Sequence, residues 1–187
     1  DYLGLEVIAV AINLRFRAEV TPLDGNHIRI AIRDASLNRL DSQNPDNLFE
    51  HLDIDLSRPI LYENKRDYLR STVNVLLRHG CNLQGCAVRL DSEIPIGKGM
   101  CSSSTMIIAL IRALLENISH PHKDDPRYIA ELAFAAEVAE FAEPGGKMDH
   151  YTSALGGLVH LDFGGEMRIN KIEARLNGDF ILFDSLA

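Results

Sequence analysis

Pro95-Ile-Gly-Lys-Gly-Met-Cys-Ser-Ser-Ser-Thr105 is the stretch that decides the fold of this chain. Its two glycines permit a sharp turn and a close approach of the backbone to a ligand. The apolar run that follows, residues 106–115, predicts a helix over residues 102–117. The unpaired N–H groups of its first turn and the positive end of its dipole would face the loop and favour a bound phosphate. A glycine turn followed by serine N-caps is the simpler interpretation of the same pattern.

The loop matches neither of two common phosphate-binding motifs. Lys98 lies between the glycines, and no Gly-Lys-Ser/Thr follows a four-residue gap as in a P-loop. Ser102 stands where the dinucleotide-binding fingerprint needs its third glycine. The hydroxyls of Ser102, Ser103 and Ser104 offer side-chain donors and a hard oxygen ligand for Mg²⁺. From spacing alone, a phosphate loop of another kind and a plain structural turn both stay open.

The same stretch resembles the Pro-x-Gly-x-Gly-Leu-Ser-Ser-Ser-Ala motif of the GHMP kinases, which include galactokinase, homoserine kinase, mevalonate kinase and phosphomevalonate kinase. The matching positions are Pro95, Gly97, Gly99, Ser102 and Ser103. Met100 replaces the Leu of the motif, Cys101 its first Ser and Ser104 its Ala. The resemblance implies that Ser103 helps to hold Mg²⁺. It also implies contacts to the ATP phosphates from Pro95, Gly97, Lys98, Gly99, Cys101, Ser102, Ser103 and Ser104.

A second segment, residues 136–150, is similar to the galactokinase stretch that runs from Ala-Glu to Gly-x-Met-Asp-Gln. Glu137 precedes Asp149 by twelve positions, which is the family spacing between a Mg²⁺ ligand and the catalytic Asp. The resemblance therefore implies Glu137 as a metal ligand and Asp149 as the base. His150 stands where Gln is usual. Without the resemblance, a carboxylate after a Gly-Gly turn can accept a hydroxyl proton, but solvated surface acids are the simpler interpretation of both residues.

Two neighbours of Asp149 are open to several interpretations. Lys147 can stabilise the charged form of Asp149, touch a phosphate or remain a solvated surface lysine. His150 can tune the pKa of Asp149 or contact the substrate.

The chain opens with Asp1-Tyr-Leu-Gly-Leu-Glu-Val-Ile-Ala-Val-Ala-Ile12, which resembles the end of the galactokinase signature Gly-Glu-His-Thr-Asp-Tyr and the strand behind it. This implies that Asp1, together with Gly146 and Asp149, contacts a sugar. An exposed terminus is the plain alternative. Under the resemblance, residues 1–187 correspond to the N-terminal, ATP-loop domain, and the C-terminal GHMP domain is absent. Such a fragment is expected to be inactive by itself.

Composition agrees with one globular domain. A chain of 187 residues can bury a substantial core. Its net charge of −8 argues against a nucleic-acid partner, although not against ATP, which backbone dipoles and Mg²⁺ can bind. No apolar run reaches the length of a membrane span. Three cysteines without metal-binding spacing favour reduced thiols and a cytoplasmic location.

Periodicity predicts an α/β (α+β) domain. We expect helices over residues 68–78, 102–117 and 125–140, and strands within the ranges 5–20, 27–33, 48–56, 85–91, 156–163 and 179–184. The resemblance implies a two-layer sandwich like domain 2 of ribosomal protein S5.

The expected activity is Mg²⁺- and ATP-dependent phosphorylation of a small alcohol. The favoured substrate is a sugar, phosphorylated at its anomeric hydroxyl as in galactokinase. One alternative is another GHMP substrate: a different sugar, mevalonate or homoserine. The other is a sugar-sensing relative without turnover.

Overall fold

The computed structural model describes residues 1, 3–34, 49–95, 98–174, 178–179 and 181 of the chain. Gly97 and most of the strand expected over residues 179–184 lie outside the described residues. The remaining expectations can be compared with the structure directly.

Four strands form the larger sheet. They are β2 (Phe16–Pro22), β3 (His27–Asp34), β4 (Phe49–Asp55) and β5 (Cys86–Ser92), in the order β2-β5-β3-β4. Only the β3–β5 pair is parallel. Side chains alternate between the two faces of the sheet, so Ile28, Ile30, Val88 and Leu90 are buried while their neighbours in sequence point away. This alternation is what predicted half-buried strands.

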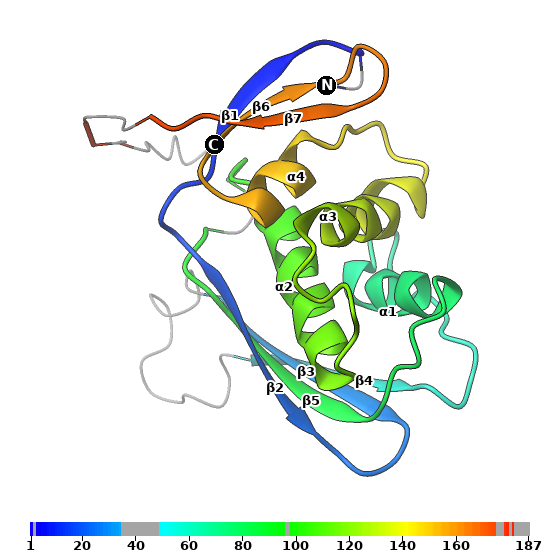
Figure 1. Ribbon diagram of the computed structural model, residues 1–187. Helices are drawn as coiled ribbons and strands as arrows, with labels where there is room; N and C mark the ends of the chain where they lie inside the picture. The colour runs from blue at the N-terminus through cyan, green and yellow to red at the C-terminus, as the bar shows by residue number, and fades with distance from the viewer. Residues whose placement is uncertain (2, 35–48, 96–97, 175–177, 180, 182–187) are drawn as a thin grey trace.

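Helices α1 (Tyr68–Arg78), α2 (Ser102–Asn117) and α3 (Pro126–Phe134) lie on one side of this sheet (Figure 1). Helix α2 packs against β2 and β5, and α1 and α3 pack against α2. The side chains of Ile107, Leu110 and Leu115 are completely buried. A helix that is apolar on most of its circumference belongs in the middle of a domain. The helix predicted after the glycine loop is therefore the central element of the fold.

The helix expected over residues 125–140 consists of two parts. Asp125 caps α3 by accepting hydrogen bonds from the backbone N–H groups of Arg127 (3.0 Å) and Tyr128 (3.2 Å). After Phe134 the chain continues as a π-helix, Ala135–Ala139, in which the N–H of Glu140 bonds to the carbonyl of Ala135 five residues back. Such segments are rare and occur often at functional sites. Here the π-helix carries Glu137.

A smaller antiparallel sheet lies next to helix α4 (Met148–Leu155), as Figure 1 shows. It contains β1 (Val7–Val10), β6 (Leu158–Asp162) and β7 (Arg168–Lys171) in the order β1-β6-β7. Its buried residues Val159 and Leu161 belong to the same apolar cluster as the residues under the larger sheet. The mixed α/β class is confirmed, whereas α4 and β7 had not been predicted.

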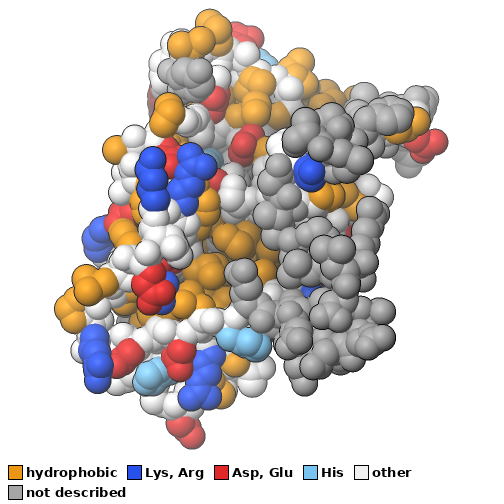
Figure 2. Space-filling model, turned by 180° about the vertical axis from the view of Figure 1, so that it is seen from behind, with side chains coloured by type: hydrophobic (Ala, Val, Ile, Leu, Met, Phe, Trp, Pro, Cys, Tyr) orange, Lys and Arg blue, Asp and Glu red, His pale blue; other side chains and the backbone are white. Residues whose placement is uncertain are grey.

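The surface of the larger sheet carries charges of both signs. Arg29 lies beside Asp53, and both Arg33 and Arg89 lie beside Asp91. Figure 2 shows acidic and basic side chains interspersed over the described part of this side of the molecule. Among the described helices, none is both long enough and apolar enough to cross a bilayer.

Candidate functional site

The phosphate loop leads directly into α2. Gly99 has a φ of +72°, a left-handed conformation that favours glycine. Cys101, at the N-cap, has a φ of +54° and makes no side-chain capping bond to the helix. The N–H groups of Ser102, Ser103 and Ser104 precede the first helical hydrogen bond, which runs from Thr105 to the carbonyl of Cys101. The helix therefore presents uncapped donors at the loop, with its positive end in the same direction.

The carboxylate of Glu137 lies beside these hydroxyls. Ser103 Oγ donates to Oε1 at 2.6 Å, and Ser104 Oγ donates to Oε2 at 2.6 Å. His150 Nε2 lies 2.8 Å from Oε2. Burial by itself would raise the pKa of Glu137, but the hydrogen bonds from His150, Ser103 and Ser104 outweigh it and hold the pKa below its ordinary value. The structure thus brings together Ser103 and Glu137, which the sequence pairs as metal ligands.

The donor atoms of this pair suit a magnesium ion that is shared with a nucleotide. A hydroxyl and a carboxylate are hard oxygen ligands, and Mg²⁺ is usually bound through one or two carboxylates plus phosphates and water. The described residues contain no cluster of three or more His, Cys, Asp or Glu that could hold an ion without help. Ser103 and Glu137 therefore fit a metal that takes its other ligands from phosphate and water.

Asp149 lies in the first turn of α4 and faces the phosphate loop. Cys101 and Asp149 line the same hollow. Burial, together with the nearby Asp149 carboxylate, raises the pKa of the Cys101 thiol to about 12. The candidate base and the candidate phosphate loop therefore border one hollow.

Asp1 lies at the start of the same helix. Its Oδ2 accepts a hydrogen bond from the N–H of Met148 at 2.7 Å, so a negative charge caps α4. A Cβ on Gly146 would lie only 1.8 Å from that oxygen, so the carboxylate occupies space that any other residue at 146 would fill. Asp1, Gly146 and the turn that carries Asp149 are neighbours, as the resemblance implied.

The two residues beside Asp149 point in different directions. Lys147 Nζ lies 2.7 and 2.8 Å from the carboxylate oxygens of Glu131, and 5.1 Å from the centroid of the Phe134 ring. Its charge is therefore balanced by Glu131. His150 is 2% exposed and contacts Glu137, a partner that sequence reasoning did not propose. The only available signal was its departure from the usual Gln.

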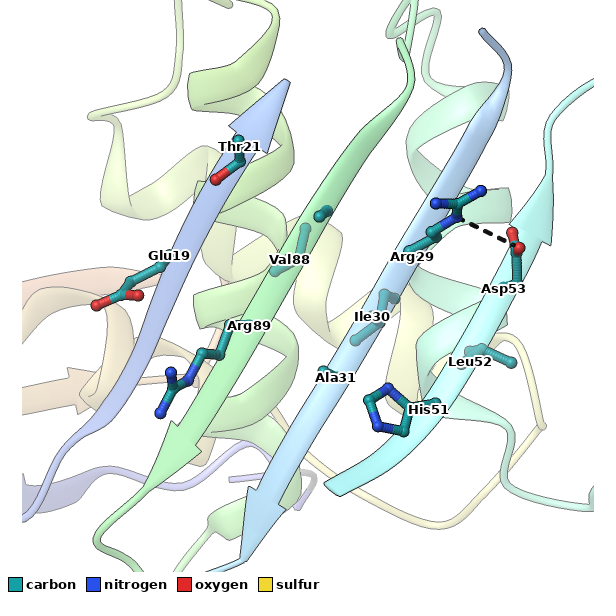
Figure 3. A pocket seen from close by; sticks show the side chains of 11 residues that line it. Glu19, Thr21, Arg29, Ile30, Ala31, His51, Leu52, Asp53, Val88 and Arg89 are labelled. Atoms are coloured by element: carbon teal, nitrogen blue, oxygen red, sulfur yellow. Dashed lines mark ion pairs between the residues drawn. The ribbon is translucent and has the colours of Figure 1, made fainter. Parts of the chain in front are cut away.

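A hollow of about 580 Å³ opens beside this group and is lined by Phe16, Ile94, Cys101, Met148 and Asp149, among others. Its position next to the candidate base makes it the natural place for a small substrate. The structure contains a second hollow, of about 560 Å³, on the outer face of the larger sheet (Figure 3). The sequence-predicted site residues do not line that second hollow.

Residues 67–157 match the model of the family described as GHMP kinases N terminal domain. This segment of the chain is therefore similar to the N-terminal domain of the GHMP kinases. The matched region includes the three serines of the loop, Glu137 and Asp149.

Proteins of known function or known structure are similar to most of this chain. The mevalonate kinase of Thermococcus sibiricus is 26% identical over 162 residues, which are 86% of this chain and 46% of that protein. The mevalonate kinase structure of Methanococcus jannaschii aligns with a TM-score of 0.70 at 20% identity, over 92% of this chain and 50% of the other. The Lactococcus lactis galactokinase structure with galactose aligns with a TM-score of 0.71 at 16% identity, over 99% and 48%. The structural alignments establish a shared fold, and the chain spans about half the length of each of these GHMP kinases.

Proposed function

We propose that this chain supplies the ATP-binding and proton-accepting side of a small-molecule kinase. The observation that carries the proposal is the contact between Ser103 and Glu137 at the start of α2, with Asp149 and Cys101 lining one hollow beside it. Helix α2, the π-helix and α4 thus bring together the N-terminus of a helix that can bind phosphate, a hydroxyl and a carboxylate that can bind Mg²⁺, and a second carboxylate that can accept a proton. Phosphoryl transfer to an alcohol requires these three parts.

The loop and α2 bind the triphosphate. Backbone N–H groups of Ser102, Ser103 and Ser104 donate to phosphate oxygens, and the helix dipole favours their negative charge. Pro95, Gly97, Lys98, Gly99 and Cys101 are the other proposed members of the cradle. Mg²⁺, held by Ser103 and Glu137, would neutralise charge on the phosphates. Because these donors are fixed before the nucleotide arrives, little reorganisation is needed during the reaction.

Asp149 receives the proton of the attacking hydroxyl. The substrate oxygen forms a bond to the γ-phosphorus while the bond from that phosphorus to the bridging oxygen of ADP breaks. The hydroxyl proton passes to the Asp149 carboxylate, so the products are ADP and a phosphorylated alcohol. This carboxylate lines the same hollow as Cys101 of the loop.

A sugar phosphorylated at its anomeric hydroxyl is the first candidate substrate. Asp1 places a second carboxylate at the start of α4, near the turn of Asp149, and two carboxylates suit a ligand with several hydroxyls. Mevalonate is the second candidate, because a mevalonate kinase is similar to this chain over 86% of its length. The parts that complete the active site are proposed to come from the second GHMP domain. A cytoplasmic location, expected from three cysteines that are unpaired in the structure, belongs to the same proposal.

The test uses the full-length gene product with Mg-ATP and a panel of free sugars, mevalonate and homoserine, and follows ADP release. Asp149→Asn should reduce substrate-dependent release by about 10²- to 10⁴-fold. Asp124→Asn makes the same chemical change at an exposed position and should have no effect. Release with mevalonate alone would select the second candidate. Binding of nucleotide and sugar without release would instead identify a sensor and contradict the kinase.

A further inference from the structure

Two residues that differ from the GHMP motifs contact the same carboxylate oxygen. Ser104 stands where the loop motif has Ala, and His150 stands where the second motif has Gln. Ser104 lies on α2 and His150 on α4, yet both contact the same oxygen, Oε2 of Glu137, at 2.6 and 2.8 Å. Both residues are about 2% exposed, so water does not compete for these hydrogen bonds.

The two oxygens of Glu137 are therefore unequal. Oε2 accepts from Ser104 and His150, whereas Oε1 accepts only from Ser103 among the described residues. Rotating the carboxylate so that both oxygens face one ligand would break two buried hydrogen bonds. Using Oε1 alone breaks only the bond from Ser103, whose own oxygen lies beside it.

We infer that Ser104 and His150 are positioning residues that hold Oε2 of Glu137, so that Oε1 is presented together with Ser103 Oγ to a divalent cation carried by the nucleotide. This inference rests on the proposed function. Outer groups that hydrogen-bond to metal ligands orient them, and their removal typically weakens metal binding by about 10- to 100-fold.

The surroundings of His150 select one tautomer. The ring meets Phe134 edge-on, with centroids 5.7 Å apart and an interplanar angle of 89°. His150 Nδ1 is buried and makes no hydrogen bond within the described part of the chain. A proton on Nδ1 would be a buried unpaired donor and would turn the Nε2 lone pair toward a carboxylate. Nε2 therefore carries a proton and donates to Glu137.

A purely structural role is the competing explanation, because the same contacts join α2, the π-helix and α4. Metal binding separates the two roles. We would titrate the full-length protein, saturated with a non-hydrolysable ATP analogue, with Mn²⁺ and follow free Mn²⁺ by electron paramagnetic resonance. Ser104→Ala and His150→Phe should each weaken Mn²⁺ binding about 10-fold. His150→Gln, whose amide can donate to the same oxygen, should stay within about 3-fold of wild type.

Ser153→Ala is the matched control. It removes a hydroxyl that lies 3.3 Å from Thr105 Oγ1 and so also joins α4 to α2, without contacting Glu137. Unchanged Mn²⁺ binding in Ser153→Ala is expected. Equal weakening in Ser153→Ala and Ser104→Ala, or wild-type binding in both Ser104→Ala and His150→Phe, would overturn the inference.

Two further readouts keep the test decisive. Histidine ¹⁵N shifts of the wild-type protein should show a proton on Nε2 of His150, and an unprotonated Nε2 would contradict the inference even if a variant fails to fold. Wild type that binds no Mn²⁺ with the ATP analogue and releases no ADP would defeat the proposed function itself. Normal wild-type binding and turnover with unaffected variants would defeat only the positioning role.

Discussion

At the scale of single residues, Gly146 is a position where one added methyl group would meet a candidate substrate-binding carboxylate. The Asp1 carboxylate occupies the volume of a side chain at 146 and accepts a hydrogen bond from Met148. Backbone and carboxylate can approach this closely only because Gly146 lacks a Cβ.

Gly146→Ala should displace Asp1 and leave the rest of the fold in place, because the obstructed atoms belong to a short side chain that can rotate away. If Asp1 contacts the substrate, KM for the substrate should rise about 10-fold while KM for ATP stays the same, which corresponds to the loss of one charged hydrogen bond. Steady-state kinetics on the full-length protein measures both constants.

Gly145→Ala is the matched control for this variant. The nearest atoms to its Cβ would belong to the side chain of Val138, at 3.2 Å. A similar rise of substrate KM in both alanine variants would mean that the turn, and not Asp1, is responsible.

At the scale of elements, the N-cap of α3 contributes to the placement of Glu137. Asp125→Ala removes the acceptor of two backbone N–H groups and should destabilise the protein by about 1 kcal/mol, which lowers Tm by about 2–4 °C in a domain of this size. Thermal unfolding measures the change. Asp124→Ala, one residue earlier and exposed, should leave Tm unchanged, and an equal loss in both variants would argue against the cap.

Elements with a long, uniform pattern were predictable from the sequence. The apolar run after the loop gave the bounds of α2, and the alternation of residues 27–33 indicated β3. The π-helix could not be foreseen, because alanine-rich sequence favours helix without distinguishing i+4 from i+5 bonding. Helix α4 was not predicted, because it is short and follows Gly145 and Gly146, which indicate a turn. Strand β7 (Arg168–Lys171) was not predicted, because it is short and largely polar.

At the scale of the whole molecule, one apolar cluster spans both sheets. Leu110 on α2 and Leu161 on β6 are both fully buried in it. Replacing either by Ala should cost about 2–5 kcal/mol and lower the midpoint of the same urea transition. Leu77→Ala, at a residue that is 38% exposed, should cost much less. A separate transition for Leu161→Ala would mean that the small sheet unfolds independently.

The sequence indicated which residues form the candidate site, but it did not indicate the contacts that those residues make with one another. The spacing of the two motifs brought Ser103, Glu137 and Asp149 into one hypothesis, and the structure places Ser103 and Glu137 in contact. The interactions of Ser104 and His150 with Glu137 depend on how α2, the π-helix and α4 pack together. These contacts could not be predicted from the sequence, because the three residues lie in three elements that are separated along the chain.

Cys101 has a chemical consequence of its own. Its neighbours keep the sulfur protonated at neutral pH, so a thiol beside the proposed reaction centre should be inert toward iodoacetamide and peroxide. Asp149→Asn removes the charge that contributes to this protection, while burial remains, so alkylation of Cys101 should become faster. Mass spectrometry of labelled peptides would follow the rate, with the buried Cys81 and Cys86 as internal references. The sulfur would then serve as a built-in reporter of the charge at position 149.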